Sequence, residues 1–324
     1  MDKTIKLFIK KSACTQADLA EAFDWIRLNR EVKPGDLVLL KPNLTYPKYK
    51  PGVTTSPPVL EATIKLLRDL GAKIVVGESD GGYNSYEVKD AYHDFGLYEL
   101  ERRYGIKIVN FSADKTSWRY LTINKYAKQF QVEYPALLEE CDHFITLPVP
   151  KVHAMTGISL SYKNQWGCVP NTMRLRYHPI FNEAIFAINQ IPKSKFTIID
   201  GAYGLTRSGP MVGDAFNLGW LLAANNFEAA DLVASRLMKV ELRRITHYRK
   251  VFKAGLVPDL AMVLFNQDYR PLISDRFYLK RDIWNYLALA AWLHPTINHF
   301  FYESCAADLL HKIMYTFRKR PISD

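Results

Sequence analysis

The sequence predicts a doubly wound α/β fold, in which a mostly parallel sheet carries helices on both faces and a helical tail follows. Six short apolar runs rich in β-branched residues recur along the chain, and longer helical patterns separate them. Runs that are apolar on successive residues indicate strands buried on both faces, as in parallel sheets. Alternation of such strands with helices is typical of a layered α/β structure.

The expected elements follow in order. The predicted strands cover residues 37–40, 73–76, 106–109, 143–147, 196–199 and 260–264. A helix is predicted from residue 57, with Ser56 as its cap, Pro57 and Pro58 in its first turn, and Gly71 at its end. Its buried face consists of Leu60, Ile64 and Leu67. Further helices are predicted at 87–104, 133–141, 179–191 and 218–239.

The chain divides into an α/β domain at 1–275 and a helical segment at 276–324. Within the second part, an apolar run at 283–293 is broken by His294 and Pro295 and resumes at 297–302. Eleven apolar residues are about half of the ~20 that a membrane-spanning helix needs. Two alternatives remain for this segment. It packs on the core or on a partner subunit, which we favour, or residues 283–320 lie on an anionic membrane surface, with basic residues 318–320 in contact with it.

The composition excludes several classes of protein. The 43 Lys and Arg against 33 Asp and Glu give a net charge of +10, which favours anionic partners. No nucleic-acid-binding module is recognisable and the basic residues are spread along the chain, so nucleic acid is not an expected partner. The four cysteines show no CxxC spacing, and the short apolar stretch at the N-terminus does not suit a secretory signal. We expect a cytoplasmic protein, and the oligomeric state is left open.

Polar residues follow four of the predicted strands. Lys41 and Asn43 follow the first, Asp80 follows the second, Lys151 and His153 follow the fourth, and Asp200 follows the fifth. Ligands of open parallel sheets bind beyond the carboxyl ends of the strands. We therefore expect these side chains at one rim. The alternative is that such positions hold ordinary turn residues, which explains Gly, Pro and Asn better than it explains Lys and His.

The stretch 148–178 is the densest in groups that bind anions. Lysine supplies a point charge, and arginine can donate hydrogen bonds to two oxygens of an anion at once. The alternative is a solvated basic loop, although the Pro, Trp and Gly residues in the stretch favour an ordered one. The polar residues concerned are Lys151, His153, Thr156, Ser159, Ser161, Lys163, Asn164, Arg174, Arg176 and His178.

His153 and His178 are predicted proton carriers or metal ligands. With Asp200, Glu78 or Asp80 they would complete a site for a divalent metal, but no HExxH spacing supports it, and a structural histidine is the alternative.

Two further segments have more than one interpretation. Thr54 and Thr55 precede the helix at 57 and either cap it or bind an anion there. Residues 201–213 are glycine-rich without a dinucleotide or phosphate-loop fingerprint. Gly209 in this stretch either lets the backbone approach a ligand or permits a positive φ.

Several motifs in order resemble the DUF362 family, a domain of unknown function. They are KPN at 41–43, TTSP at 54–57, GAKIVVGES at 71–79, PxxKxH at 148–153, YKNQWG at 162–167, Arg176 with His178, DGAYG at 200–204, GP at 209–210 and AAD at 229–231.

The resemblance implies that the family's signature falls on Lys151, His153, Lys163, Asn164 and Gly167. Many relatives carry a fused ferredoxin-type module with iron–sulfur clusters, which implies redox chemistry. This chain has no CxxCxxC run, so no cluster of its own is expected, and it has Ser56 where relatives often have His.

The leading hypothesis is an enzyme that binds a phosphate- or carboxylate-bearing small molecule at the rim, with metal assistance or a redox link left open. His153, Lys151 and Asp200 are the predicted catalytic residues, and His153, Asp200 and His178 are the predicted ligands of a divalent metal. The predicted substrate-binding residues are Lys41, Asn43, Thr54, Thr55, Asp80, Lys163, Asn164, Arg176, His178 and Gly209. The alternative is a non-catalytic binding or scaffold protein attached to the cytoplasmic membrane face by its tail, and a third hypothesis is electron transfer through a bound cluster or flavin.

Overall fold

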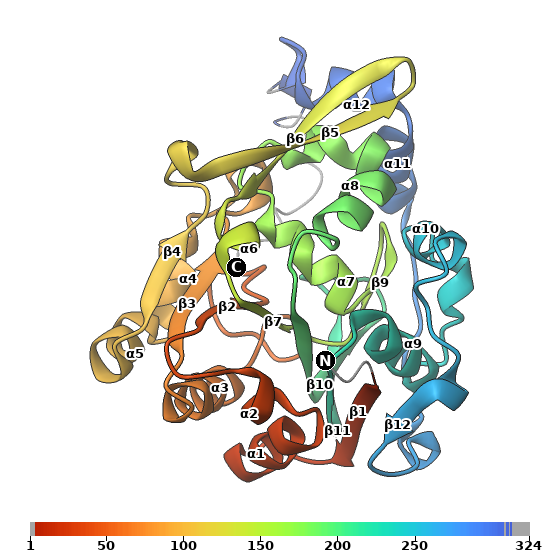
Figure 1. Ribbon diagram of the computed structural model, residues 1–324. Coiled ribbons are helices and arrows are strands. Elements are labelled where there is room, and N and C mark those ends of the chain that lie inside the picture. Colours follow the sequence, from red (N-terminus) through yellow and green to blue (C-terminus); the bar gives the residue numbers. More distant parts are fainter. Residues whose placement is uncertain (1–3, 308, 311, 313–324) are drawn as a thin grey trace.

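A ten-stranded sheet forms the centre of the computed structural model, which describes residues 4–307, 309, 310 and 312 (Figure 1). Eight of its strands run in the order β12-β1-β11-β10-β7-β2-β3-β4, and β8 and β9 branch from β10. The predicted α/β fold with a mostly parallel sheet is confirmed. The strands of this sheet are β1 (Ile5–Lys11), β2 (Leu37–Pro42), β3 (Lys73–Glu78), β4 (Lys107–Asn110), β7 (His143–Leu147), β8 (Lys151–His153), β9 (Gly157–Ser159), β10 (Lys195–Thr206), β11 (Asp214–Ala224) and β12 (Val263–Phe265).

The strands predicted at 37–40, 73–76, 106–109, 143–147 and 196–199 lie side by side and parallel in the sheet. β2 pairs with β3 and β7, β3 pairs with β4, and β10 pairs with β7. Their carboxyl ends therefore meet at one edge. Successive side chains enter different cores, since Val38 and Leu40 belong to one buried cluster and Leu39 to the other. This is the reason why these strands are apolar at every position.

Helices cover both faces of the sheet (Figure 1). One layer consists of α1 (Gln16–Trp25), α2 (Leu28–Glu31), α3 (Pro57–Asp69), α4 (Val88–Asp94) and α5 (Leu97–Tyr104). The other consists of α6 (Leu137–Glu140), α7 (Ser161–Asn164), α8 (Phe181–Ile188), α9 (Phe227–Leu237) and α10 (Tyr248–Lys253).

The helix predicted from residue 57 is α3, and its face of Leu60, Ile64 and Leu67 is fully buried. Ser56 precedes it but makes no side-chain cap. The helix predicted at 87–104 is divided into α4 and α5 at Gly96, whose φ is +66°. The prediction at 179–191 corresponds to the shorter α8.

Three predicted elements were wrong in part. Residues 214–224 form β11 rather than the start of a helix at 218–239, because this apolar run pairs with both β1 and β10. The first three residues of the helix predicted at 133–141 belong instead to the end of β6 (Lys128–Pro135), and the helix that forms is the short α6. Strand β6 pairs with β5 (Trp118–Lys125) in a separate hairpin against α8. The strand predicted at 260–264 is a 3₁₀ turn followed by the short edge strand β12. Strand β1 was not predicted.

The C-terminal segment forms α11 (Ile283–Leu293) and α12 (Pro295–Tyr302), with Pro295 in the first turn after the break. Both helices contact the 3₁₀ helix at Arg174–Ile180. The Trp292 ring stacks on His178 with 3.4 Å between ring centroids. Among the described residues, no helix combines the length and apolar character needed to cross a membrane. Basic residues 318–320 lie outside the described residues.

Candidate functional site

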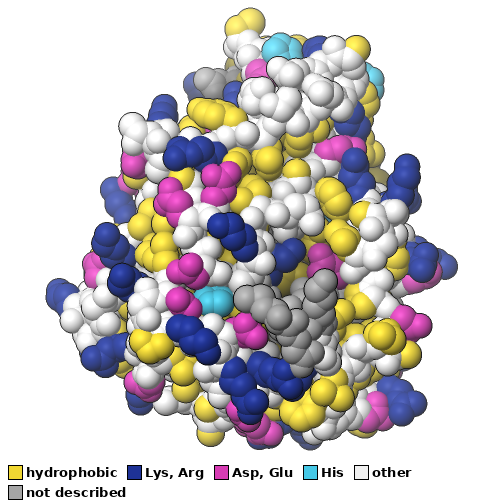
Figure 2. Space-filling view, viewed as in Figure 1, with side chains coloured by type: hydrophobic (Ala, Val, Ile, Leu, Met, Phe, Trp, Pro, Cys, Tyr) yellow, Lys and Arg dark blue, Asp and Glu magenta, His cyan; other side chains and the backbone are white. Residues whose placement is uncertain are grey.

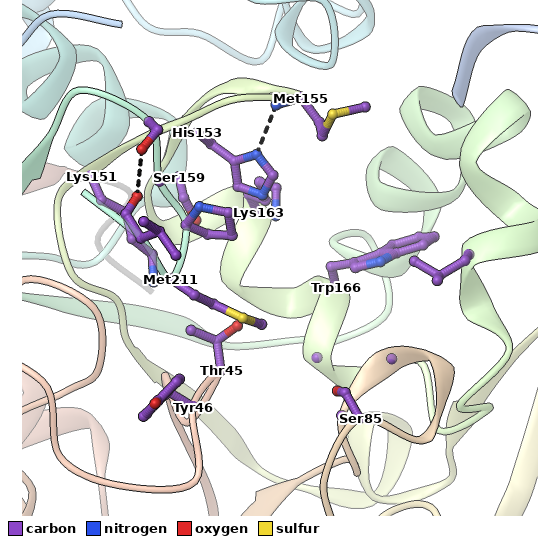
Figure 3. A pocket seen from close by; sticks show the side chains of 18 of the residues that line it. Thr45, Tyr46, Ser85, Lys151, His153, Met155, Ser159, Lys163, Trp166 and Met211 are labelled. Atoms are coloured by element: carbon purple, nitrogen blue, oxygen red, sulfur yellow. Dashed lines mark hydrogen bonds between the residues drawn. The ribbon is translucent and has the colours of Figure 1, made fainter. Parts of the chain in front are cut away.

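A cavity of about 900 Å³ opens at the carboxyl ends of the parallel strands (Figure 3). Its wall combines the segments after β2 and β3, residues 151–178, the loop 207–212, and parts of α11 and α12. Segments from across the whole chain therefore contribute to one site, which is where open α/β sheets place their ligands.

Basic side chains outnumber acidic ones on the described wall of this cavity. The acids are Glu78, which is paired with Lys41, and Asp282, whose Oδ1 accepts a hydrogen bond from the Asn285 amide at the start of α11. Both carboxylates are thus already engaged within the protein, so the cavity presents a net positive charge. The basic residues of the wall are Lys50, Lys151, Lys163, Arg174, Arg207, Lys280 and Arg281.

Lys151 is the first residue of β8, and its side chain is almost wholly buried. Its Nζ donates to the Val53 carbonyl at 2.5 Å, and no described carboxylate pairs with it. Burial, together with the neighbouring charges of Lys163 and Lys41, holds the pKa of Lys151 well below its usual value.

Lys163 lies on the short helix α7, and a buried carboxylate fixes the start of that helix. The Ser161 and Tyr162 amides donate to Asp231 of α9 at 2.9 and 2.8 Å, and the Tyr248 hydroxyl also donates to Asp231. This anchor sets the direction of α7 and so places Lys163 in the cavity wall. Burial and the charge of Arg174 lower the pKa of Lys163 to about 7.

His153 is held in one tautomer. Its Nδ1 accepts from the backbone amides of Met155 at 3.1 Å and Thr156 at 3.4 Å (Figure 3). A ring nitrogen that accepts carries no hydrogen, so the hydrogen of the neutral imidazole is on Nε2. Burial and the charges of Lys163 and Lys151 hold the pKa of His153 well below its usual value. His153 is therefore a neutral donor through Nε2.

The three predicted metal ligands do not form one group, because His153 and His178 line the cavity and Asp200 does not. A metal bound at Nε2 of His153 would need the lone pair that the hydrogen occupies, and His178 stacks on Trp292. Both oxygens of Asp200 accept hydrogen bonds: Oδ2 from the amide and hydroxyl of Ser56, each at 2.7 Å, and Oδ1 from the Ala202 amide. Within the described part of the chain, no three His, Cys, Asp or Glu side chains form a group that could hold a metal ion.

The cavity brings together seven of the predicted site residues. They come from the segments after β2 and β7, from α7, from the 3₁₀ helix at Arg174–Ile180 and from the loop after β10. Gly209 permits the close approach of this loop, because a Cβ there would lie 1.8 Å from the Val152 carbonyl oxygen. The seven residues are Asn43, Lys151, His153, Lys163, Asn164, His178 and Gly209.

The other predicted residues are engaged inside the protein instead of facing the cavity. Asp80 accepts from the Val88 amide at the start of α4 and from Asn110. Arg176 donates to Glu133 and Tyr177.

Hydrogen bonds within the protein also hold the two threonines before α3. Thr54 bonds with the backbone of Lys50, and Thr55 donates to the Leu147 carbonyl. Asp200 is joined to Ser56, as described above.

Lys41 lies directly behind the cavity wall. Its Nζ donates to Glu78 Oε2 at 2.5 Å and to the Pro42 carbonyl at 2.7 Å, with both side chains buried. Gly167 packs on this pair, because a Cβ there would lie 2.3 Å from Glu78 Oε1 and 2.9 Å from Lys41 Nζ. The glycine of the KNxxG motif therefore leaves room for a buried ion pair.

Other basic residues of the wall were marked only weakly in the sequence. Arg174 and Arg176 both lie in the predicted basic stretch, and Arg176 was the predicted binding residue. In the structure Arg174 lines the cavity, whereas Arg176 donates to Glu133. Arg174 donates to the Val169 and Asp80 carbonyls, which fixes its guanidinium at the wall. Lys280 and Arg281 arrive from the C-terminal segment, and no local pattern marked them.

Comparison with known proteins places the chain in a family. Residues 38–236 match the model of a family described as "Domain of unknown function (DUF362)". Thylakoid-associated protein sll1697 of Synechocystis is 28% identical over 286 residues, which are 83% of this chain and 84% of that protein.

Among solved structures, the lactate racemase apoprotein of Thermoanaerobacterium thermosaccharolyticum is similar with a TM-score of 0.44 and 14% identity over 72% of this chain. This chain covers 56% of the racemase chain. The family match spans more than half of the present sequence and includes the residues of the KxH and KNxxG motifs. The chain belongs to the DUF362 family.

Proposed function

We propose that the cavity binds an anionic small molecule bearing a phosphate or carboxylate group, and that the protein is an enzyme acting on it by acid–base chemistry. The observation that carries this proposal is the pair Lys151 and Lys163, which face the cavity with no described carboxylate as partner. Burial without a counter-charge disfavours the ammonium form of these side chains, and a bound anion would stabilise it. Such an arrangement is therefore better suited to ligand binding than to structural stability.

Four side chains of the cavity have complementary chemical roles. Arg174 supplies positive charge for the anionic group, and its guanidinium can bind two of that group's oxygens. The buried amine of Lys151 is a further nitrogen donor to the same group. His153 offers its Nε2 hydrogen to an oxygen that gains negative charge during reaction. A lysine that titrates near pH 7, as Lys163 does, can both accept and return a proton at neutral pH. A redox link to this chemistry stays a prediction.

Phosphate binding should depend on Lys163. We expect inorganic phosphate to stabilise the protein against heat, and the variant Lys163→Met to lose most of that stabilisation. Loss of one charged hydrogen bond costs about 1.5–3 kcal/mol, which corresponds to roughly 10-fold weaker binding or more. Differential scanning fluorimetry and titration calorimetry, each with phosphate and with citrate, measure the effect relative to each variant without ligand.

The exposed residue Lys253 on α10 does not line the cavity, so Lys253→Met is the matched control. This control should bind phosphate as the parent protein does. Equal phosphate affinity in Lys163→Met and Lys253→Met would contradict the proposal.

A second candidate function is attachment to an anionic membrane surface through α11 and α12. Apolar side chains on these helices are open to solvent, including Leu287 at 56% and Leu293 at 63% exposure. The basic residues Lys280 and Arg281 lie just before Asp282, which caps α11, and the whole chain carries a net charge of +10. Apolar groups beside basic ones suit the interface of an anionic bilayer. The similar Synechocystis protein is named for its association with thylakoids.

Figure 2 shows basic side chains scattered over one face of the molecule with hydrophobic ones between them. Membrane attachment would therefore depend on the local apolar surface of α11 and α12 in addition to charge.

Vesicle binding distinguishes this second candidate. We expect the protein to sediment with phosphatidylglycerol vesicles and not with phosphatidylcholine vesicles. The double variant Leu287→Ser, Leu293→Ser should bind at least about tenfold more weakly, because burial of a leucine contributes roughly 1.5–3 kcal/mol. Leu256→Ser changes an exposed leucine after α10 and is the control. Equal sedimentation of both variants on phosphatidylglycerol would exclude these helices as the attachment site.

A further inference from the structure

Lys163 lines the cavity together with other basic groups. When it is protonated, its charge acts on Lys151 and His153 of β8, on His178 and on His247, which belong to three different segments. Figure 3 shows Lys163 beside the His153 ring. No hydrogen bond or ion pair of its Nζ is found among the described residues, and the nearest defined contact is the Phe181 ring, 5.9 Å from Nζ to centroid.

These surroundings favour a free amine over an ammonium ion. A lysine that is desolvated and placed beside other cations loses its proton near neutral pH and becomes nucleophilic. Lys163 meets both conditions, since its side chain lies half-buried in the cavity wall and the charge of Arg174 acts on it. Lys151 differs, because its Nζ is already directed to the Val53 carbonyl.

We propose that Lys163 is a nucleophile that condenses with the carbonyl carbon of a 2-oxo carboxylate bound in this cavity to form an imine. This inference rests on the proposed function, because the same basic groups must first bind the carboxylate. It adds the substrate class and the covalent step.

The arrangement of the neighbouring groups favours this substrate class. The Nε2–H of His153 is a donor that does not ionise at neutral pH, which suits polarisation of a carbonyl oxygen. Arg174 and Lys151 suit the carboxylate that is attached to the carbonyl carbon. A simple phosphate would use the cations but would leave the amine and the imidazole donor without a reacting group.

The proposed step balances without an oxidant or reductant. The lone pair of Nζ attacks the carbonyl carbon, and the π electrons of the carbonyl move to its oxygen. The nitrogen gives up its two protons, the oxygen receives them and leaves as water, and a C=N bond replaces the C=O bond. Protonation of the imine nitrogen then places a positive charge beside the bound carboxylate.

Reductive trapping tests the inference. The protein is incubated with pyruvate and sodium cyanoborohydride near neutral pH, digested, and its peptides are identified by mass spectrometry. We expect one dominant reduced pyruvate adduct on Lys163, formed at least tenfold faster than on any exposed lysine. Inorganic phosphate should suppress the adduct on Lys163 and leave labelling of exposed Lys253 unchanged. The variant Lys163→Met should lack this adduct, and Lys253→Met should keep it.

The outcomes separate this inference from the proposed function. If calorimetry shows that pyruvate and phosphate bind but no adduct forms on Lys163, the imine is overturned and the anion site stands. Labelling of Lys163 at the rate of exposed lysines, unaffected by phosphate, would also overturn the imine. Because the adduct is located in the unmodified protein, the result does not depend on whether Lys163→Met folds.

Discussion

Replacement of Glu78 by alanine should lower the free energy of unfolding by about 3–5 kcal/mol, because it leaves the buried ammonium of Lys41 without its counter-charge. The two side chains are joined at 2.5 Å and are 6% or less exposed. After the substitution, the Pro42 carbonyl is the remaining defined acceptor for Lys41 Nζ. Chemical denaturation followed by circular dichroism measures the loss.

An exposed ion pair supplies the control. Glu87 pairs with Lys89, and both side chains are about two-thirds exposed, so Glu87→Ala should change the stability by about 0–1 kcal/mol. The double variant Lys41→Met, Glu78→Leu removes both charges and should be more stable than Glu78→Ala alone, because no unpaired charge stays buried. If Glu78→Ala costs no more than Glu87→Ala, the ion pair does not stabilise the rim.

The parallel half of the sheet could be predicted because its strands carry an unambiguous pattern. Strands such as β2 contribute alternate residues to two separate cores, so each position is apolar. The apolar run in β11 gives the same signal as a buried helix. Its strand conformation comes from pairing with β1, more than 200 residues away in sequence, and with β10. Local sequence carries no information about such partners.

The location of the candidate site was predictable for a similar reason. The carboxyl ends of parallel strands meet at one edge of the sheet. Correct prediction of these strands therefore also predicts that Asn43, Lys151 and His153, which follow them, lie close together. The sequence could not predict which polar side chains form hydrogen bonds within the protein and therefore do not face the cavity. Asp200 accepts hydrogen bonds from Ser56, which lies 144 positions away in the sequence. This interaction forms only when α3 packs against the sheet.

The pKa of Lys163 leads to a stability that rises with pH. Folding lowers this pKa from an ordinary value near 10.5 to about 7, so between these values the unfolded chain binds more protons than the folded one. Under that condition the free energy of unfolding increases with pH. Below about pH 7 Lys163 is protonated in both the folded and the unfolded chain, so its buried charge destabilises the folded protein to the full extent. Above about pH 10.5 neither state is charged and the cost disappears.

A variant without the amine isolates this contribution. Lys163→Met should be more stable than the parent protein at pH 6.5 by on the order of 3 kcal/mol, since each unit of pKa corresponds to about 1.4 kcal/mol and the side chain keeps some contact with water. The advantage should shrink steadily up to pH 9.5. Urea denaturation of both proteins at four pH values measures the difference, with Lys253→Met as a reference expected to show none. A difference independent of pH would mean that Lys163 is charged in the folded protein at neutral pH and is not the free amine that imine formation requires.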